Sequence, residues 1–357
     1  MSRPIRNILF CALLPIGDTL FTTPAIRAVR MRYPQARIVA LTYPTNSGIL
    51  SASPDISAIW LAPTRERFGG LDQVRDLISR IRGARFDLTL EFSNYNYGLR
   101  AWGRVGAAYD MRLPRLWWVR PGAGRTWRQR HAVEHYADVA RRAGIPVTDW
   151  ALRIYATLDE IAACDARLRT HGVRAGEPLI GIHPGGEGLW GRKQWGARGF
   201  AEVADRLHAR FGMKIVVLGG QEDARTAAQV ARWSAAPVLN LAGQTTLGET
   251  AALARRCRVF IGNDSSPLHI AAAAGTRVVG IYGLTDPRSY RPWVPGGQDG
   301  RDYAVVESPA PCAACFPLVG GITVVEWLRC VRCNALAAIT ADQVVAAAAS
   351  LLASDAL

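Results

Sequence analysis

Short runs of apolar residues alternate along the chain with longer stretches in which apolar residues recur at helical spacing. The first pattern is typical of buried strands and the second of helices that bury one face. In the first half the pattern predicts strands at residues 7–14, 37–43, 58–61 and 86–92, and helices at 18–32 and 71–82. In the second half it predicts strands at 179–183, 214–218, 238–241, 259–261 and 278–281, and helices at 200–211, 224–234, 247–255 and 267–274. Such alternation predicts parallel sheets covered by helices on both faces.

The alternation restarts after a helical stretch at 158–169, which indicates two domains. A chain of 357 residues is long for one compact domain and sufficient for two. We therefore expect two doubly wound α/β domains facing a cleft, at residues 1–165 and 166–340. The apolar helix predicted at 341–352 leads us to expect that residues 341–357 pack back towards the first domain. Ligands of such sheets bind at the carboxyl ends of the strands.

One strand-to-helix turn, GNDSSPLHIAAAAG at residues 262–275, gathers polar groups at a helix start. Pro267 fits the first helical position and Ser266 fits the N-cap. The N–H groups and the positive dipole end of the helix attract anions there. The polar groups of this turn are Asp264, Ser265, Ser266 and His269. The alternative is that the acid and the serines only cap the helix.

Two further turns of the second domain carry groups suited to a nucleotide. The Gly-rich segment HPGGEGLWGRKQW, residues 183–195, contains Lys193, and the only other lysine is Lys214. A lysine is a point charge suited to a diphosphate, although a solvated surface cation is the alternative. The segment VLGGQEDA, residues 217–224, contains Glu222, whose carboxylate is suited to ribose hydroxyls. Together with the turn at 262–275, these segments predict a nucleotide-diphosphate pocket.

The first domain offers one candidate for proton transfer. Asp18 follows the first predicted strand, in the segment LLPIGDTLFTTPAIRAVR. Inverting transfer of a sugar requires a carboxylate that takes the proton from the acceptor hydroxyl. Asp18 fits that role; the alternative is an acid that only stabilises the helix dipole.

Three segments resemble the bacterial heptosyltransferases of glycosyltransferase family 9. They are GDTLFTTPAIRAVRMRYPQARI, then HPG with KQW, and GNDSSPLHIAAAAGTRVVGIYG. The resemblance extends from about residue 5 to about residue 350 and looks closest to the heptosyltransferase III branch. It implies a GT-B fold of two Rossmann-like domains and inverting transfer of heptose from ADP-heptose to the lipopolysaccharide inner core. It also implies a reaction centre without a metal.

The resemblance assigns roles to individual residues. By position, Asp18 matches the catalytic base, Lys193 the phosphate-binding lysine and Glu222 the ribose-binding acid. The residues that match the turn holding the diphosphate and the donor sugar are Asp264, Ser265, Ser266 and His269. The segment before Lys193 is Gly-rich where relatives often have threonine, so the phosphate contacts in that segment stay open.

A net charge of +14 indicates an acidic partner. The segment RLPRLWWVRPGAGRTWRQRH interleaves arginine with tryptophan, which suits nucleic acid, an anionic membrane surface or a plain solvated loop. We favour the membrane and an anionic glycolipid acceptor, and expect no nucleic-acid partner. The contact residues expected are Arg112, Arg115, Trp117, Trp118 and Arg120. The chain start does not look like a signal peptide and no apolar run is long enough for a membrane span, which favours the cytoplasmic face of the inner membrane.

Seven cysteines are present. Three of them, Cys11, Cys164 and Cys257, fall in predicted strands or helices, which favours a reducing compartment. The other four form a CxxC…CxxC set at Cys312, Cys315, Cys330 and Cys333. This spacing suits a structural zinc or iron, and unpaired thiols are the alternative. Two alternative functions also stay open: a family 9 transferase that glycosylates a protein or another saccharide, and a non-catalytic protein that binds nucleotides or nucleic acid.

Overall fold

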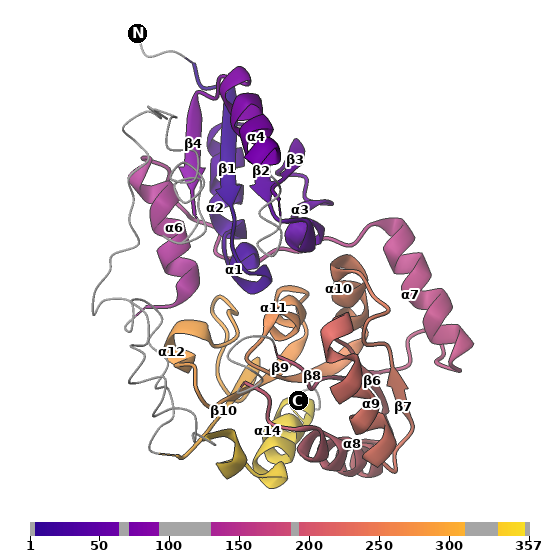
Figure 1. The fold of residues 1–357 in the computed structure, drawn as a ribbon. Coiled ribbons are helices and arrows are strands. Elements are labelled where there is room, and N and C mark those ends of the chain that lie inside the picture. The colour runs from indigo at the N-terminus through magenta and orange to yellow at the C-terminus, as the bar shows by residue number, and fades with distance from the viewer. Residues whose placement is uncertain (1–3, 64–70, 93–129, 187–192, 311–334, 354–357) are drawn as a thin grey trace. The chain divides into compact units, whose positions relative to one another are not determined.

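The computed structural model describes residues 4–63, 71–92, 130–186, 193–310 and 335–353 (Figure 1). Contacts divide them into two compact units. The first comprises the described residues up to Phe92 together with Ala132–Tyr155, and the second comprises Arg130, His131 and the described residues from Ala156 onward. The division after Tyr155 comes earlier than the predicted boundary at 165. The reason is that helix α7 (Leu158–Thr170) packs on helix α10 (Leu247–Arg255) of the second unit.

The first unit contains a parallel sheet in the order β3-β2-β1-β4. The strands are β1 (Asn7–Ala12), β2 (Arg37–Thr42), β3 (Ala58–Leu61) and β4 (Leu88–Glu91). The helices are α1 (Ile16–Phe21), α2 (Thr23–Arg32), α3 (Ser47–Leu50), α4 (Leu71–Gly83) and α6 (Ala132–Arg142), with a short 3-10 helix η1 (Pro44–Asn46). Leu9 and Cys11 pack in one core with α4. Successive strand residues face opposite sides, and Phe10 accordingly joins an aromatic cluster that reaches α6.

The helix predicted at 18–32 is in fact two helices separated at Thr22. Pro24 has no N–H, and its ring clashes with the carbonyl four residues earlier in a continuous helix. Threonine hydroxyls bind the carbonyls at the break: Thr22 donates to Thr19 at 2.7 Å, and Thr23 donates to Leu20 at 2.8 Å. The sequence TLFTTP therefore bends the chain without leaving these carbonyls unsatisfied.

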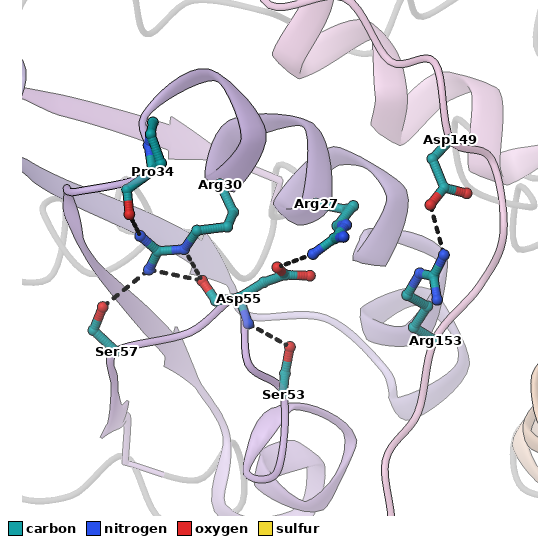
Figure 2. A network of polar contacts seen from close by, with 8 residues as sticks. All are labelled: Arg27, Arg30, Pro34, Ser53, Asp55, Ser57, Asp149 and Arg153. Atoms are coloured by element: carbon teal, nitrogen blue, oxygen red, sulfur yellow. Dashed lines mark hydrogen bonds and ion pairs between the residues drawn. The ribbon is translucent and has the colours of Figure 1, made fainter.

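Helix α2 is fixed by the arginines on one of its faces (Figure 2). Arg27 forms an ion pair with the buried Asp55 at 2.8 Å. Arg30 donates to the backbone carbonyls of Pro34, just before β2, and of Asp55, just before β3. The residues after α6 are tied to the same helix, because the N–H of Arg153 donates to Thr23 at 3.1 Å. These bonds give Arg27 and Arg30 structural partners.

The second unit contains a parallel sheet in the order β10-β9-β8-β5-β6-β7. Its strands are β5 (Leu179–His183), β6 (Lys214–Val217), β7 (Val238–Asn240), β8 (Cys257–Asn263), β9 (Arg277–Tyr282) and β10 (Tyr303–Glu307). Besides α7 and α10, its helices are α8 (Ala197–Phe211), α9 (Ala224–Trp233), α11 (Ser266–Ala273), α12 (Pro287–Tyr290) and α14 (Ala341–Ala353), with 3-10 helices η5 (Gln221–Asp223) and η6 (Ala335–Ala338). One core lies between the sheet and α8, α9 and α14, and another between the sheet and α7, α10 and α11.

The expected α/β fold of two doubly wound units is confirmed, with further corrections to the elements. Strand β10 and helices α3, α6 and α12 were not predicted. The apolar face of helix α14 was expected to pack towards the first domain. Instead, Val344, Ala348 and Leu351 belong to the core of the second unit, together with α8 and strands of that sheet. The apolar character of this helix is explained by that core.

Candidate active site

The strand order of each sheet indicates where a ligand binds. In both sheets the first strand of the unit lies inside, and the following strands are added first on one side and then on the other. The reversal occurs between β1 and β4 in the first unit and between β5 and β8 in the second. At such a switch point the connecting helices leave in opposite directions and open a crevice at the carboxyl ends of the strands. Asp18 follows β1, and Asp264 follows β8.

Asp264 is the centre of a charged cluster in which Asp264 and His269 are buried and Lys193 is partly exposed. Its Oδ2 lies 2.8 Å from Nζ of Lys193, and its Oδ1 lies 3.5 Å from Nε2 of His269. Burial opposes ionisation of this carboxyl, but Lys193 and His269 outweigh that effect and hold the pKa of Asp264 well below its usual range. The cluster therefore contains a carboxylate neutralised by a lysine, and the three predicted residues are brought together.

The start of α11 lies next to this cluster. Ser265 is the N-cap, one residue earlier than predicted, and Ser266 and Pro267 are the first two helical residues. The hydroxyl of Ser265 donates to the carbonyl of Asn263 at 3.1 Å and does not cap the helix. Both serines are partly exposed. The Ser265 hydroxyl thus does not occupy the N–H groups of the first turn, and such groups at a helix start are suited to an anion.

Asn263 joins the two segments that flank the cluster. Its side chain is fully buried, and Nδ2 donates to the carbonyls of Pro184 at 3.0 Å and Gly185 at 2.8 Å. Its Oδ1 accepts the N–H of Trp195 at 3.1 Å. The side-chain amide of Asn263 therefore ties the turn after β5 to the segment 193–195, which contains Lys193. The sequence contains this asparagine directly before Asp264, but its role was not predicted.

The turn after β6 separates an exposed acid from a buried one. Glu222 is exposed, whereas Asp223 is buried and accepts the N–H of Gly220 at 2.9 Å. A Cβ at Gly185 would lie 1.8 Å from Oδ1 of Asp223, which explains the glycine in the HPG segment. His183 of that segment donates to the carbonyl of Leu218 at 3.0 Å, and burial lowers its pKa. It is therefore a neutral structural residue.

Asp18 lies in the first turn of α1, in the first unit. The hydroxyl of Tyr136 on α6 donates to its Oδ1 at 2.8 Å. The start of α1 is also held by Asn46, which is buried and donates to the carbonyl of Leu14 and to the hydroxyl of Thr19. Asp18 is thus an acid near a strand end with a defined hydrogen-bond partner. The sequence predicted Asp18 but not its partner Tyr136.

Several predicted residues lie outside the described part of the chain. These are the expected acceptor contacts Arg112, Arg115, Trp117, Trp118 and Arg120, and the expected metal ligands Cys312, Cys315, Cys330 and Cys333. The other three cysteines are buried, and burial raises the pKa of the Cys164 and Cys257 thiols to about 12. Among the described residues, no helix has the length and apolar composition needed to span a bilayer.

The sequence model of glycosyltransferase family 9 (heptosyltransferase) matches residues 74–316. The chain belongs to this family. It is therefore a glycosyltransferase, and the resemblance inferred from three motifs is confirmed. Lipopolysaccharide heptosyltransferase 3 of Escherichia coli strain K12 is 29% identical over 294 residues, which are 78% of this chain and 82% of that protein.

Solved structures show the GT-B fold. The glycosyltransferase family 9 protein of Veillonella parvula has a TM-score of 0.80 at 22% identity, over 99% of this chain and 98% of that one. The ADP-heptose lipopolysaccharide heptosyltransferase II of E. coli has a TM-score of 0.72 at 21% identity, over 98% and 100%. The iron-containing dodecameric glycosyltransferase TibC of E. coli has a TM-score of 0.55 at 16% identity, over 97% and 75%.

Proposed function

We propose that this glycosyltransferase moves heptose from ADP-heptose to the lipopolysaccharide inner core with inversion at the anomeric carbon. The observation that carries the proposal is the Lys193–Asp264–His269 cluster beside the start of α11, with a buried acid and a partly exposed lysine. A lysine and a helix start together suit a diphosphate. The heptosyltransferases named above supply the choice of heptose, of an ADP-linked donor and of a lipopolysaccharide acceptor.

In the proposed reaction, the carboxylate of Asp18 takes the proton of the acceptor hydroxyl. The oxygen of that hydroxyl attacks the anomeric carbon of the donor sugar. The bond from that carbon to the diphosphate oxygen breaks, and ADP leaves with the electron pair. Lys193 and the N–H groups at Ser266 stabilise the negative charge that develops on ADP. Glu222, exposed after β6, binds the ribose hydroxyls of the donor. Because the protein supplies this positive charge itself, we propose that catalysis uses no metal.

The acceptor side of the proposal concerns the arginine- and tryptophan-rich segment. Arg112, Arg115, Trp117, Trp118 and Arg120 are proposed to contact the anionic glycolipid and the inner-membrane surface. Arginine binds anionic head groups, and tryptophan prefers the interface between lipid and water. The net charge of +14 supports an acidic partner. We therefore propose a cytoplasmic enzyme bound peripherally to the inner membrane, with no nucleic-acid partner.

The four cysteines of the CxxC…CxxC set are proposed to hold one structural zinc or iron. Four thiolates at this spacing suit a tetrahedral ion, and the structurally similar TibC is described as containing iron. Elemental analysis of protein purified without chelator should find about one equivalent, which Cys312→Ser should remove together with some thermal stability. A metal-free protein that is as stable as the cysteine variant would contradict this role.

The test of the function is transfer in solution. The purified protein is incubated with ADP-heptose and truncated core glycolipids, and the products are measured by mass spectrometry. We expect one added heptose, and we expect Asp18→Asn to lower the rate by ~10²–10⁴-fold while ADP affinity stays nearly unchanged. Transfer only to a protein or to another saccharide would replace the proposed acceptor. Absence of any product, with no rise in melting temperature on adding ADP, would favour a non-catalytic protein.

A further inference from the structure

The hydroxyl of Tyr136 and the carboxylate of Asp18 form a hydrogen bond between parts of the chain that are 118 positions apart. The distance from the hydroxyl oxygen to Oδ1 is 2.8 Å. Asp18 is partly exposed in the first turn of α1, whereas Tyr136 on α6 is buried, with 3% of its surface exposed. The donor thus belongs to the interior of the first unit, and the acceptor lies where a substrate can approach it.

The tyrosine ring has a rigid support. Its centroid lies 6.4 Å from that of Phe92, which follows β4, and Phe92 stacks on Phe10 of β1 at 4.1 Å. Both phenylalanines are buried. The strands β1 and β4 that carry this stack are the pair at the switch point. The position of the phenol oxygen is therefore set by the same two strands that form the switch point of this sheet.

We propose that Tyr136 is the positioning residue for Asp18. This inference rests on the proposed function, in which Asp18 is the base. A hydrogen bond to Oδ1 fixes the rotation of the carboxylate relative to α1, so that the base meets the acceptor hydroxyl in one orientation. The bond also stabilises the charged form of the carboxyl group relative to the protonated form. Tyr136 therefore orients the base and favours its charged form, without itself touching the reacting atoms.

Other ionisable groups surround this pair, and they must be separated from it in any measurement. Helix α1 packs on α2, α3, η1 and α6, and α6 also packs on β4. Helix α3 and η1 contain no ionisable side chain. The others carry Arg27, Arg30 and Arg32 on α2, Glu134, His135, Asp138, Arg141 and Arg142 on α6, and Glu91 on β4. A comparison of two proteins that differ only in the Tyr136 hydroxyl leaves all these groups in place.

The test substitutes Tyr136→Phe, which keeps the ring and removes the hydroxyl. The control is Tyr303→Phe, since Tyr303 is a buried tyrosine of the second unit whose hydroxyl accepts from Arg291 at 2.9 Å. The pKa of Asp18 is measured by NMR titration of protein labelled with ¹³C in the aspartate carboxyls, with Asp18→Asn used for assignment. The pH dependence of kcat/KM for transfer is measured on the same proteins.

We expect Tyr136→Phe to raise the pKa of Asp18, because a hydrogen bond to the charged carboxylate is lost. The acid limb of kcat/KM should move by the same amount, and kcat should fall while KM for ADP-heptose stays constant. Tyr303→Phe should move neither the titration nor the limb.

Three results would overturn the inference. An unchanged Asp18 titration would show that the bond does not act on the carboxylate. A shifted titration with an unchanged acid limb would show that the bond is only structural. If Asp18→Asn transfers heptose at the wild-type rate, the proposed base is wrong and the inference falls with it. Only this last result affects the proposed function, so the two failures are distinguishable.

Discussion

Substitution of Lys193 by alanine has a consequence that follows from the carboxylate beside it. In the folded protein, Lys193 is 2.8 Å from Asp264, and the pair carries no net charge. In Lys193→Ala the buried Asp264 stays close to the proposed diphosphate site without its lysine. The variant therefore loses the ammonium that attracts a phosphate group. The carboxylate of Asp264, no longer paired with a lysine, repels the same phosphate group.

The size of the effect can be estimated from charge-assisted hydrogen bonds. One such bond between the ammonium and a phosphate oxygen contributes about 1.5–3 kcal/mol, which is roughly a 10- to 150-fold change in affinity. Repulsion from Asp264 adds to this loss, because two unit charges about 4 Å apart interact by about 4 kcal/mol at an effective dielectric constant of 20. We expect ADP to bind Lys193→Ala at least about 100-fold more weakly, and AMP to be affected less.

Isothermal titration calorimetry with ADP and AMP measures these losses, and a double substitution tests their cause. Lys193→Ala combined with Asp264→Asn should recover part of the ADP affinity, since the repulsive charge is gone. Lys214→Ala is the matched control, because the other lysine of the chain pairs with Glu177 at 3.1 Å and should leave ADP affinity unchanged. Equal losses for ADP and AMP, or no recovery in the double variant, would refute the electrostatic explanation.

Three further predictions concern the frame of the site. Gly185→Ala places a Cβ 1.8 Å from Asp223 and should destabilise the protein by about 1–3 kcal/mol in denaturant unfolding, whereas Gly83→Ala, which meets nothing within 4 Å, should not. Asn263→Ala should lower both the melting temperature and the ADP affinity, since two backbone carbonyls and the Trp195 N–H lose their partner; unchanged ADP affinity would argue against its holding Lys193. The ionised Asp264 contributes its full stabilisation above its unfolded pKa of about 3.9, and this stabilisation is lost as the pH falls through the lower pKa of the folded state. Lys193→Ala removes a charge that lowers the folded pKa. Melting temperatures measured against pH should therefore begin to fall at a higher pH in Lys193→Ala than in the wild-type protein.

Most strands could be predicted because strands of parallel sheets are buried on both faces and read as continuous apolar runs. β1, β2 and β5 are such runs, and their burial is nearly complete. The predicted helix at 18–32 failed at Pro24, where the local cost of a proline outweighed the amphipathic pattern. Helix α6 was not predicted, because none of the usual N-cap residues Ser, Thr, Asp or Asn stands directly before Ala132 to mark a helix start.

The site was predicted as residue types at strand ends, but not as a set of contacts. Lys193 and Asp264 are 71 positions apart, and Asp18 and Tyr136 are 118 apart, so no local pattern reports either pair. Their proximity follows from the strand order, which a single sequence does not determine. Asn263 was missed for a related reason, since a buried amide is recognisable only from the carbonyls that surround it.

Nearly all the cationic side chains of this chain are arginines, so the lysine at position 193 invites the question of what a lysine does there that an arginine does not. The chain has 43 lysines and arginines together, and only Lys193 and Lys214 are lysines. An arginine at position 193 would keep the charge, but its planar fork is larger and favours two parallel bonds to one carboxylate. In Lys193→Arg, the guanidinium would bind both oxygens of the neighbouring buried Asp264. Fewer of its N–H donors would then be directed at a phosphate. A compact ammonium with three donors can contact Oδ2 of Asp264 and a phosphate oxygen at the same time. In the proposed reaction, this cation is shared between a fixed carboxylate and the leaving diphosphate, so Lys193→Arg should weaken ADP binding although the net charge is unchanged.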